Sequence, residues 1–227
     1  MRDLTDAKFS VLADGFAGCG RVTDSAEAGR LAASLGEVAK AGKRGLLSES
    51  VVSAWARGEK LKSLVRPFLS REPVPVRAIF FDKTPDKNWL VPWHQDLNIA
   101  VEEKRETPGF GPWSVKDGLV HVRPPAAMLA DMLTIRLHLD DCDADNGALQ
   151  VLPGTHLDGI LTDDRISSAK AEKPPVLCAM RAGDALLMRP LLLHASGKSV
   201  SDRRRRVLHI EYAGFGLPGG LAWKSAA

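Results

Sequence analysis

The stretch Leu133-Thr134-Ile135-Arg136-Leu137-His138-Leu139 is dominated by apolar and β-branched side chains. Similar short runs occupy residues 76–82, 148–152, 185–193 and 206–212, and Pro, Gly, Asp or Asn bounds most of them. Short apolar runs separated by turn residues are typical of a barrel or a sandwich of strands. The pattern therefore predicts a mainly β fold with flanking helices, and its strands begin near residue 74.

The N-terminal part of the chain shows a helical pattern instead. Asp24 or Ser25 is a usable N-cap, and apolar residues recur at helical spacing from there to about residue 40. Residues 51–55 and 61–69 are predicted to form further short helical pieces. We therefore expect an N-terminal helical layer over residues 1–72.

Length and composition suit one globular domain, because the chain has 227 residues, of which 44% are hydrophobic and 26% charged. We expect a single domain over residues 1–227, with the β core at 73–227. The segment 102–125 is too long and too rich in Pro and Gly for an ordinary connection, and it is predicted to be a lid inserted over a functional site.

Charge and hydropathy limit the partners. The formal net charge is only +3, and the basic run Arg203–Arg206 would point two side chains to each face of a strand, which argues against nucleic acid. Residues 1–6 lack the pattern of a signal peptide, and no apolar run approaches the ~20 residues of a membrane helix. We expect a soluble, cytoplasmic protein with no membrane partner, and its oligomeric state stays open.

The segment Trp93-His94-Gln95-Asp96 is the first candidate for chemistry. Side chains alternate along a strand, so His94 and Asp96 project from one face and can bind one metal ion together. A single His-x-Asp pair is a weak signal, because a hydrogen-bonded surface histidine gives the same pattern.

A second histidine, His194, follows the apolar run 191–193. Together with His94 and Asp96 it supplies two imidazoles and one carboxylate, a ligand set that leaves three positions of an octahedral Fe(II) open for a bidentate co-substrate and O₂. His156 is the alternative third ligand, but Pro153-Gly154 places it beyond the end of a strand.

Arg205 lies on the following predicted strand, on the same face as Val207 and His209. A guanidinium binds a carboxylate bidentately, which the distal carboxylate of 2-oxoglutarate requires once its other end chelates the metal. Ser196 shares a face with His194, so its hydroxyl is expected to help hold that carboxylate.

Several motifs in order resemble the phytanoyl-CoA dioxygenase family of Fe(II)/2-oxoglutarate-dependent oxygenases, over roughly residues 76–213. These motifs are Phe81-Asp82-Lys83-Thr84-Pro85-Asp86, Trp93-His94-Gln95-Asp96, the segment 146–156 (NGALQVLPGTH), and His194-x-Ser196 followed by Arg205. The resemblance implies a double-stranded β-helix, which is a jelly-roll or cupin-like fold.

The resemblance also implies roles for individual residues. His94, Asp96 and His194 would be the iron ligands, Arg205 with Ser196 the anchor of the co-substrate, and Ile79 an apolar contact to it. Arg136 falls where family members often have an inward-facing aromatic residue. We expect it to bind an anionic substrate or the co-substrate, and the alternative is structural pairing with Asp140 or Asp141.

Further residues are expected near the pocket. Trp113 lies in the predicted lid and is expected to contact the substrate, as are Trp89 and Trp93 with less support. Lys83 is either exposed or part of the site, and His121 and His138 are expected in lid or packing roles. Asn146-Gly147 is predicted to form a type I′ hairpin turn, which requires positive φ at both residues.

Together these features predict an Fe(II)- and 2-oxoglutarate-dependent dioxygenase that uses O₂, hydroxylates an unactivated C–H bond of a small molecule, and releases succinate and CO₂. Ascorbate is an expected addition in vitro. The carboxylate of Asp96 favours hydroxylation, since related halogenases have a small residue in its place. The alternative is a non-catalytic cupin-like protein that binds a metal or a small acid as a sensor.

Overall fold

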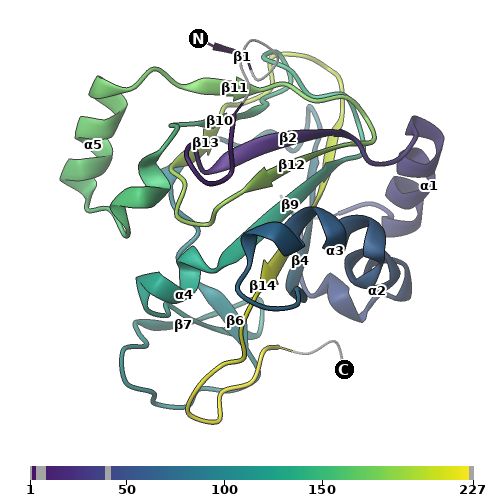
Figure 1. Cartoon of the computed structure of the whole chain (residues 1–227). Coiled ribbons are helices and arrows are strands. Elements are labelled where there is room, and N and C mark those ends of the chain that lie inside the picture. The colour runs from purple at the N-terminus through teal and green to yellow at the C-terminus, as the bar shows by residue number, and fades with distance from the viewer. Residues whose placement is uncertain (1, 4–8, 39–41, 225–227) are drawn as a thin grey trace.

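The computed structural model describes residues 2–3, 9–38 and 42–224, and its centre is a pair of β-sheets stacked face to face (Figure 1). The larger sheet is antiparallel throughout. In spatial order its strands are β2 (Phe16–Arg21), β12 (Asp184–Met188), β9 (Met132–His138), β14 (Arg205–Ala213), β4 (Val74–Lys83) and β3 (Gly42–Lys43).

The second sheet has five strands, and all its pairings are antiparallel except β1 with β11. The strands in spatial order are β1 (Arg2–Asp3), β11 (Val176–Cys178), β10 (Leu149–Val151), β13 (His194–Ser196) and β5 (Val91–His94). From β9 to β14 the chain passes repeatedly between the two sheets, and only β10 and β11 follow each other within one sheet. The predicted jelly-roll fold is confirmed.

Helices cover the outer face of the larger sheet (Figure 1). They are α1 (Ser25–Leu35), α2 (Ser50–Arg57) and α3 (Glu59–Val65), with 3₁₀ turns at η2 (Leu46–Ser48) and η3 (Arg66–Phe68). The remaining helices are α4 (Ala126–Ala130), η4 (Thr155–Asp158) and α5 (Asp163–Glu172). None of the helices in the described part of the chain is long and apolar enough to cross a membrane.

Strand alternation divides the larger sheet into an apolar face and a polar face. Phe80, Ile135 and Ile210 point outward and join the core that the helices cover. Their neighbours Ile79, Arg136 and His209 face the other sheet, and the register aligns these three in one row across β4, β14 and β9. The space between the two sheets is therefore lined by polar side chains at β4, β14 and β9, whereas a second apolar cluster fills it between β2, β12, β10 and β11. The main apolar core lies under the helices.

The predicted lid is largely ordered structure. A third sheet in the order β6-β8-β7 is built from β6 (Ile99–Val101), β8 (Leu119–Val122) and β7 (Trp113–Lys116), so the segment 102–125 contains a β-hairpin. Its turn is Asp117-Gly118, with φ of 52° and 74°. Positive φ at both central residues is the requirement of a type I′ turn, and Asp-Gly is a favoured sequence for it.

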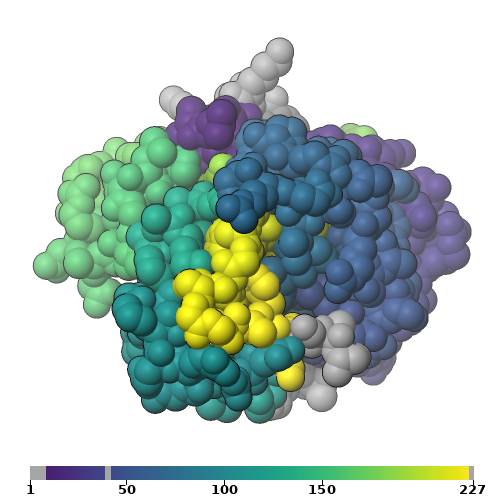
Figure 2. Space-filling view, turned by 60° about the horizontal axis from the view of Figure 1, so that its bottom comes forward, coloured from purple at the N-terminus to yellow at the C-terminus, as the bar shows by residue number. Residues whose placement is uncertain are grey.

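The C-terminal segment after β14 packs against this small sheet. Trp223 forms a bridge with Val101 and lies against the ring of Phe215. Figure 2 shows the segment in yellow, lodged between the teal chain of the small-sheet region and the blue N-terminal helices. The small sheet therefore packs against the C-terminal segment as well as against β4.

The N-terminal layer differs from its prediction. It is not entirely helical, because β2 pairs with β12 at the edge of the larger sheet. Asp24 does cap α1, accepting a hydrogen bond from the Glu27 N–H at 2.7 Å. The helix ends earlier than predicted, at Leu35, because Gly36 adopts a φ of 69°. Residues 39–41, which the predicted helix was to reach, lie outside the described residues.

The predicted hairpin at Asn146-Gly147 is wrong. Gly147 has a φ of 74°, but Asn146 is not among the residues with positive φ, and the strands on either side, β9 and β10, belong to different sheets. Asn146 is buried and its side chain holds the crossing loop, accepting from the N–H of Asp143 and donating to the carbonyl of Asp141. The role of Asn146 is therefore to make side-chain hydrogen bonds and not to adopt a turn conformation.

Gly183, just before β12, accepts hydrogen bonds from the chain just after β2. It therefore provides a test of how β2 packs at the edge of the larger sheet. Gly183 has a φ of 90°, and its carbonyl accepts from the N–H groups of Val22 and Thr23. A Cβ there would lie 2.0 Å from the Thr23 carbonyl oxygen. We expect Gly183→Ala to lower the free energy of unfolding by about 3 kcal/mol in urea titrations.

The matched control is Gly29→Ala in the middle of α1, where a Cβ would meet nothing within 4 Å. Here alanine should raise stability by roughly 0.5–1 kcal/mol, because it favours the helical backbone. Equal effects of the two substitutions would contradict the close approach at Gly183.

Candidate metal centre

A cavity of about 320 Å³ opens between the two large sheets, and the small sheet borders its mouth. Its walls come from β4, β9 and β14 on one side and from β5 and β13 on the other. Ile79, Arg136, Ser196 and Arg205, all predicted near the site, line it together with Trp89. The polar inner face of the larger sheet is thus the floor of this cavity.

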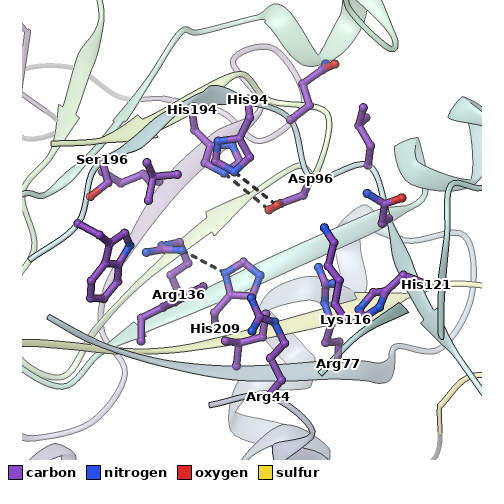
Figure 3. Close-up of a pocket in the computed structure, with 18 of the residues that line it drawn as sticks. Arg44, Arg77, His94, Asp96, Lys116, His121, Arg136, His194, Ser196 and His209 are labelled. Atoms are coloured by element: carbon purple, nitrogen blue, oxygen red, sulfur yellow. Dashed lines mark hydrogen bonds and ion pairs between the residues drawn. The ribbon is translucent and has the colours of Figure 1, made fainter. Parts of the chain in front are cut away.

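The structure brings His94, Asp96 and His194 together at the top of the cavity (Figure 3). His94 ends β5, His194 begins β13, and the two residues are direct partners in the antiparallel register. Asp96 follows β5, where its N–H donates to the Pro190 carbonyl at 2.9 Å. One ligand atom from each of the three residues lies within 4.8 Å of the others.

Both imidazoles are oriented by the backbone. His94 Nδ1 lies 2.8 Å from the Pro92 carbonyl, and His194 Nδ1 lies 2.8 Å from the Leu192 carbonyl. A carbonyl only accepts, so each Nδ1 carries the proton and each Nε2 presents its lone pair. These Nε2 atoms lie 3.8 and 3.7 Å from the carboxylate oxygens of Asp96. Second partners of this kind set the tautomer of metal-binding histidines.

Local electrostatics keep these groups in the states that bind a cation. Burial lowers the pKa of His194 to about 4, so its imidazole is neutral at physiological pH. Burial acts to raise the pKa of Asp96, but the nearby His194, His209, His94 and Arg77 outweigh it and hold the pKa well below its usual value. A neutral imidazole and an ionised carboxylate are the forms that coordinate metals.

Arg205 lies at one end of the cavity with incompletely paired N–H groups. The side chain is buried beside the Cys142 thiol, and its Nη2 lies 3.5 Å from Ser196 Oγ. Its Nε and Nη1 have no nitrogen or oxygen partner among the described residues. Ser196 in turn donates to the Gly147 carbonyl at 2.8 Å. Unpaired N–H groups on a buried guanidinium fit a carboxylate ligand, because a planar fork binds two oxygens at once.

Lys83 is part of the site rather than exposed. It pairs with Arg205 in the register of β4 and β14, and its ammonium donates to the Gly197 carbonyl at 2.6 Å. Burial and the charge of Arg205 lower the pKa of Lys83 to about 8. The end of the cavity near Ser196 therefore gathers two basic side chains with no carboxylate beside them.

A hydrogen-bonded chain crosses the cavity floor from Arg77 through Glu211 and His209 to Arg136. Arg77 Nε donates to Glu211 at 2.8 Å, and Glu211 lies 3.1 Å from His209 Nε2. His209 Nδ1 lies 3.1 Å from Arg136 Nη1 (Figure 3). Because an arginine only donates, Nδ1 of His209 accepts the hydrogen bond from Arg136. Nε2 carries a proton and donates a hydrogen bond to the Glu211 carboxylate. The chain thus fixes the orientation of the His209 ring.

Among the described residues Arg136 has no carboxylate partner. The alternative in which it pairs with Asp140 or Asp141 is therefore excluded. Asp140 pairs instead with Arg206 at 2.7 Å, and Asp141 accepts from the N–H of Ala182. The Arg136 guanidinium lies over the ring of Phe81, and burial together with Arg205 lowers its pKa to about 10.

Several expected residues lie elsewhere. Trp113 packs with the apolar cluster of the small sheet instead of lining the cavity, and Trp93 packs near α5. The imidazole of His156 lies 3.2 Å from the Leu12 carbonyl in a separate groove. His138 is buried with neither ring nitrogen bonded, whereas His121 lines the mouth of the cavity.

The sequence analysis missed Arg77 and Glu211, and also Arg44 and Lys116 at the cavity mouth. A signal for the first two existed, because alternation places Glu211 on the face of Arg205 and places Arg77 on the face of Ile79. Asp96, His209 and Glu211 form a second group with ligand atoms within 4.8 Å. Their imidazole and carboxylate are already engaged by Arg136 and Arg77, so the first group is the better metal site.

The Arg77–Glu211 pair provides a test of the floor. Glu211→Gln keeps the shape but leaves a buried guanidinium without its counter-charge, which should lower the free energy of unfolding by about 3 kcal/mol at neutral pH. Arg77 holds the pKa of Glu211 below its usual value against the effect of burial, so this stabilisation disappears as the pH falls through the acidic range. The gap between wild type and variant in urea titrations should therefore narrow in acid.

Glu72→Gln is the control, because Glu72 is an exposed partner of Arg66 and Lys62 and its loss should change stability little. A gap for Glu211→Gln that widens in acid would contradict the buried pairing.

Comparisons with solved structures show the same fold in other proteins. In fold, the chain is similar to AviO1 from Streptomyces viridochromogenes Tue57 (22% identity, 96% of this chain and 97% of that chain, TM-score 0.65). It is also similar to SnoN, a non-heme alpha-ketoglutarate-dependent epimerase from nogalamycin biosynthesis (15%, 96% and 84%, TM-score 0.67). A third is HygX from Streptomyces hygroscopicus with nickel and 2-oxoglutarate bound (18%, 89% and 84%, TM-score 0.64).

No curated protein matches the chain in sequence. The model of the phytanoyl-CoA dioxygenase (PhyH) family, by contrast, matches residues 14–207, a span that includes the candidate ligands and Arg205. This chain therefore belongs to the phytanoyl-CoA dioxygenase family.

Proposed function

We propose that this protein is an Fe(II)- and 2-oxoglutarate-dependent oxygenase that hydroxylates a small organic substrate. The observation that carries the proposal is the convergence of two Nε2 lone pairs and the Asp96 carboxylate above a buried Arg205 with unpaired N–H groups. Family membership supports the same class of enzyme, as does the similarity in fold to SnoN, an alpha-ketoglutarate-dependent epimerase, and to HygX with 2-oxoglutarate bound.

The donor set fits iron. His94, Asp96 and His194 would hold Fe(II) through two nitrogens and one oxygen, a set that leaves room for a bidentate co-substrate and O₂. No thiol lies among the residues that line the cavity. When bound, iron and 2-oxoglutarate supply the oxidising chemistry, in which O₂ is consumed and succinate and CO₂ are released.

The side chains around the co-substrate act by binding and by excluding water. Arg205 would hold the distal carboxylate of 2-oxoglutarate, and Ser196 would assist once its hydroxyl turns from the Gly147 carbonyl to the carboxylate. Ile79 would give an apolar contact from the floor. Ile79 and Ser196 are buried, so few water molecules reach this end of the cavity.

We assign Arg136 to the co-substrate rather than to the substrate. Figure 3 shows its guanidinium on the side of Ser196, away from Arg77, Lys116 and His121, and burial together with the charge of Arg205 lowers its pKa. A dianionic co-substrate would offset both buried guanidinium charges at once.

Hydroxylation is the finer part of the proposal. It rests on Asp96, which occupies the position that a halogenase would leave open for chloride. Because SnoN is an epimerase, the product decides the outcome. A product that gains one oxygen atom by mass spectrometry supports hydroxylation, whereas an unchanged mass would indicate epimerisation and a loss of two hydrogens cyclisation.

The reaction class is tested by succinate formation from 2-oxoglutarate with Fe(II), O₂ and ascorbate, first without substrate and then with a panel of small metabolites. His94→Ala should reduce turnover by more than the roughly 10–100-fold that loss of an outer partner costs. His156→Ala removes a histidine outside the cavity and should leave turnover intact. Tight binding of metal and 2-oxoglutarate without any succinate would favour a sensor.

The role of Arg136 is tested separately in the same assay. Arg136→Gln should raise the KM for 2-oxoglutarate by roughly 10–100-fold, the effect of one charge-assisted hydrogen bond. Arg57→Gln, on the surface of α2, is the control. An unchanged KM for 2-oxoglutarate in the Arg136 variant would indicate that Arg136 contacts the substrate and not the co-substrate.

A further inference from the structure

A second group of basic side chains lies across the cavity from the co-substrate end. We call Arg44, Arg77 and Lys116 the basic mouth. Figure 3 shows them on the opposite side from Ser196 and Arg136, with the three candidate ligands in between. They come from three separate parts of the chain, namely the loop after β3, strand β4 and the end of β7.

The basic mouth carries more positive than negative charge. Arg77 pairs with the buried Glu211, and Arg44 pairs with Asp117 at 2.6 Å. Lys116 has no hydrogen-bond or ion-pair partner among the described residues. In the described part of the chain, Asp96 is the only carboxylate that lines the cavity, and it belongs to the metal site.

The three charges converge on one place. Besides burial, Arg77, Lys116 and Arg44 each lower the pKa of His121, which lines the same wall. The mouth also lies close to the metal centre, because Glu211, the partner of Arg77, has a carboxylate oxygen within 4.8 Å of the Asp96 ligand atom. Arg44 and Lys116 line the same cavity as the candidate ligands, so one small molecule in that cavity can contact both groups.

Local structure holds Lys116 at the mouth and leaves Arg44 able to change partner. Lys116 directly precedes the Asp117-Gly118 turn, whose backbone conformation is the rigid one of a two-residue hairpin. The Arg44 and Asp117 side chains are 36% and 45% exposed, and such surface pairs contribute only about 0–1 kcal/mol. Replacing Asp117 by a ligand oxyanion therefore costs Arg44 little.

We propose that the substrate is an anion, whose phosphate, sulfate or carboxylate group binds to Lys116 and Arg44 at the basic mouth. Arg77 stays with Glu211 and adds to the positive field. The rest of the molecule then extends toward Asp96, where its reacting carbon would lie. The oxidation of this anion rests on the proposed function, but its binding does not.

The test is a calorimetric titration with phenyl phosphate, with benzoate as the carboxylate probe and phenol as the neutral match. Wild type should bind one or both anions, more weakly at high salt, and should not bind phenol. The double variant Arg44→Gln/Lys116→Gln should raise the Kd at least about tenfold, which is the loss expected when charge-assisted hydrogen bonds are removed.

Two matched variants serve as controls. One distinguishes loss of positive charge from loss of the ion pair, and the other distinguishes binding at the basic mouth from binding at the co-substrate end. Asp117→Asn breaks the same ion pair but keeps both cations, so phenyl phosphate should bind as well as before or more tightly. Arg205→Gln removes the opposite anion site, and binding should persist. No anion binding by wild type, an equal loss in Asp117→Asn, or a loss in Arg205→Gln with none in the double variant would overturn the proposal.

These titrations use the protein without iron or turnover, so their failure is distinct from failure of the succinate assay. Anion binding at the mouth combined with an inactive protein would leave the substrate-side inference standing and remove the oxygenase.

Discussion

Burial of charge on the inner face of the larger sheet is the constraint on which the site depends. A charged group removed from water must be paired, hydrogen-bonded or matched by a ligand. On the floor, Glu211 satisfies this requirement for Arg77, and His209 links the pair to Arg136. Among the described residues Arg205 has no carboxylate partner, and its unpaired N–H groups support the proposal that an anionic co-substrate binds at this end of the cavity.

Much of this arrangement was predictable from period-2 alternation. Alternation placed Arg205 on the face of His209, and both residues line the cavity. It also predicted that His94 and Asp96 lie together, and they do, although Asp96 lies beyond β5 and is positioned by a hydrogen bond from its N–H to the Pro190 carbonyl. The meeting of His94 with His194 required the register of two distant strands, which the order of family motifs implied but local pattern did not.

The errors have physical reasons of their own. Asn146-Gly147 and Asp117-Gly118 are equally good turn sequences, but only the second joins two neighbouring strands of one sheet. The first belongs to a crossing between sheets, where the amide of Asn146 serves as a brace. Trp113 was expected in the cavity because it lies in the insertion, yet a large aromatic gains more from burial in the apolar cluster behind the hairpin.

In the proposed arrangement, metal binding and substrate binding use residues from different sheets, and the β7–β8 hairpin contributes only to substrate binding. The candidate iron ligands belong to the five-stranded sheet and its edge, whereas Lys116 belongs to a short autonomous turn in the third sheet. If the proposed anion site is correct, changes at the hairpin tip alter substrate binding without changing the candidate iron ligands. Diversification of substrate preference within such a scaffold requires only a few exposed positions, and recombination of tips offers an economical route for engineering.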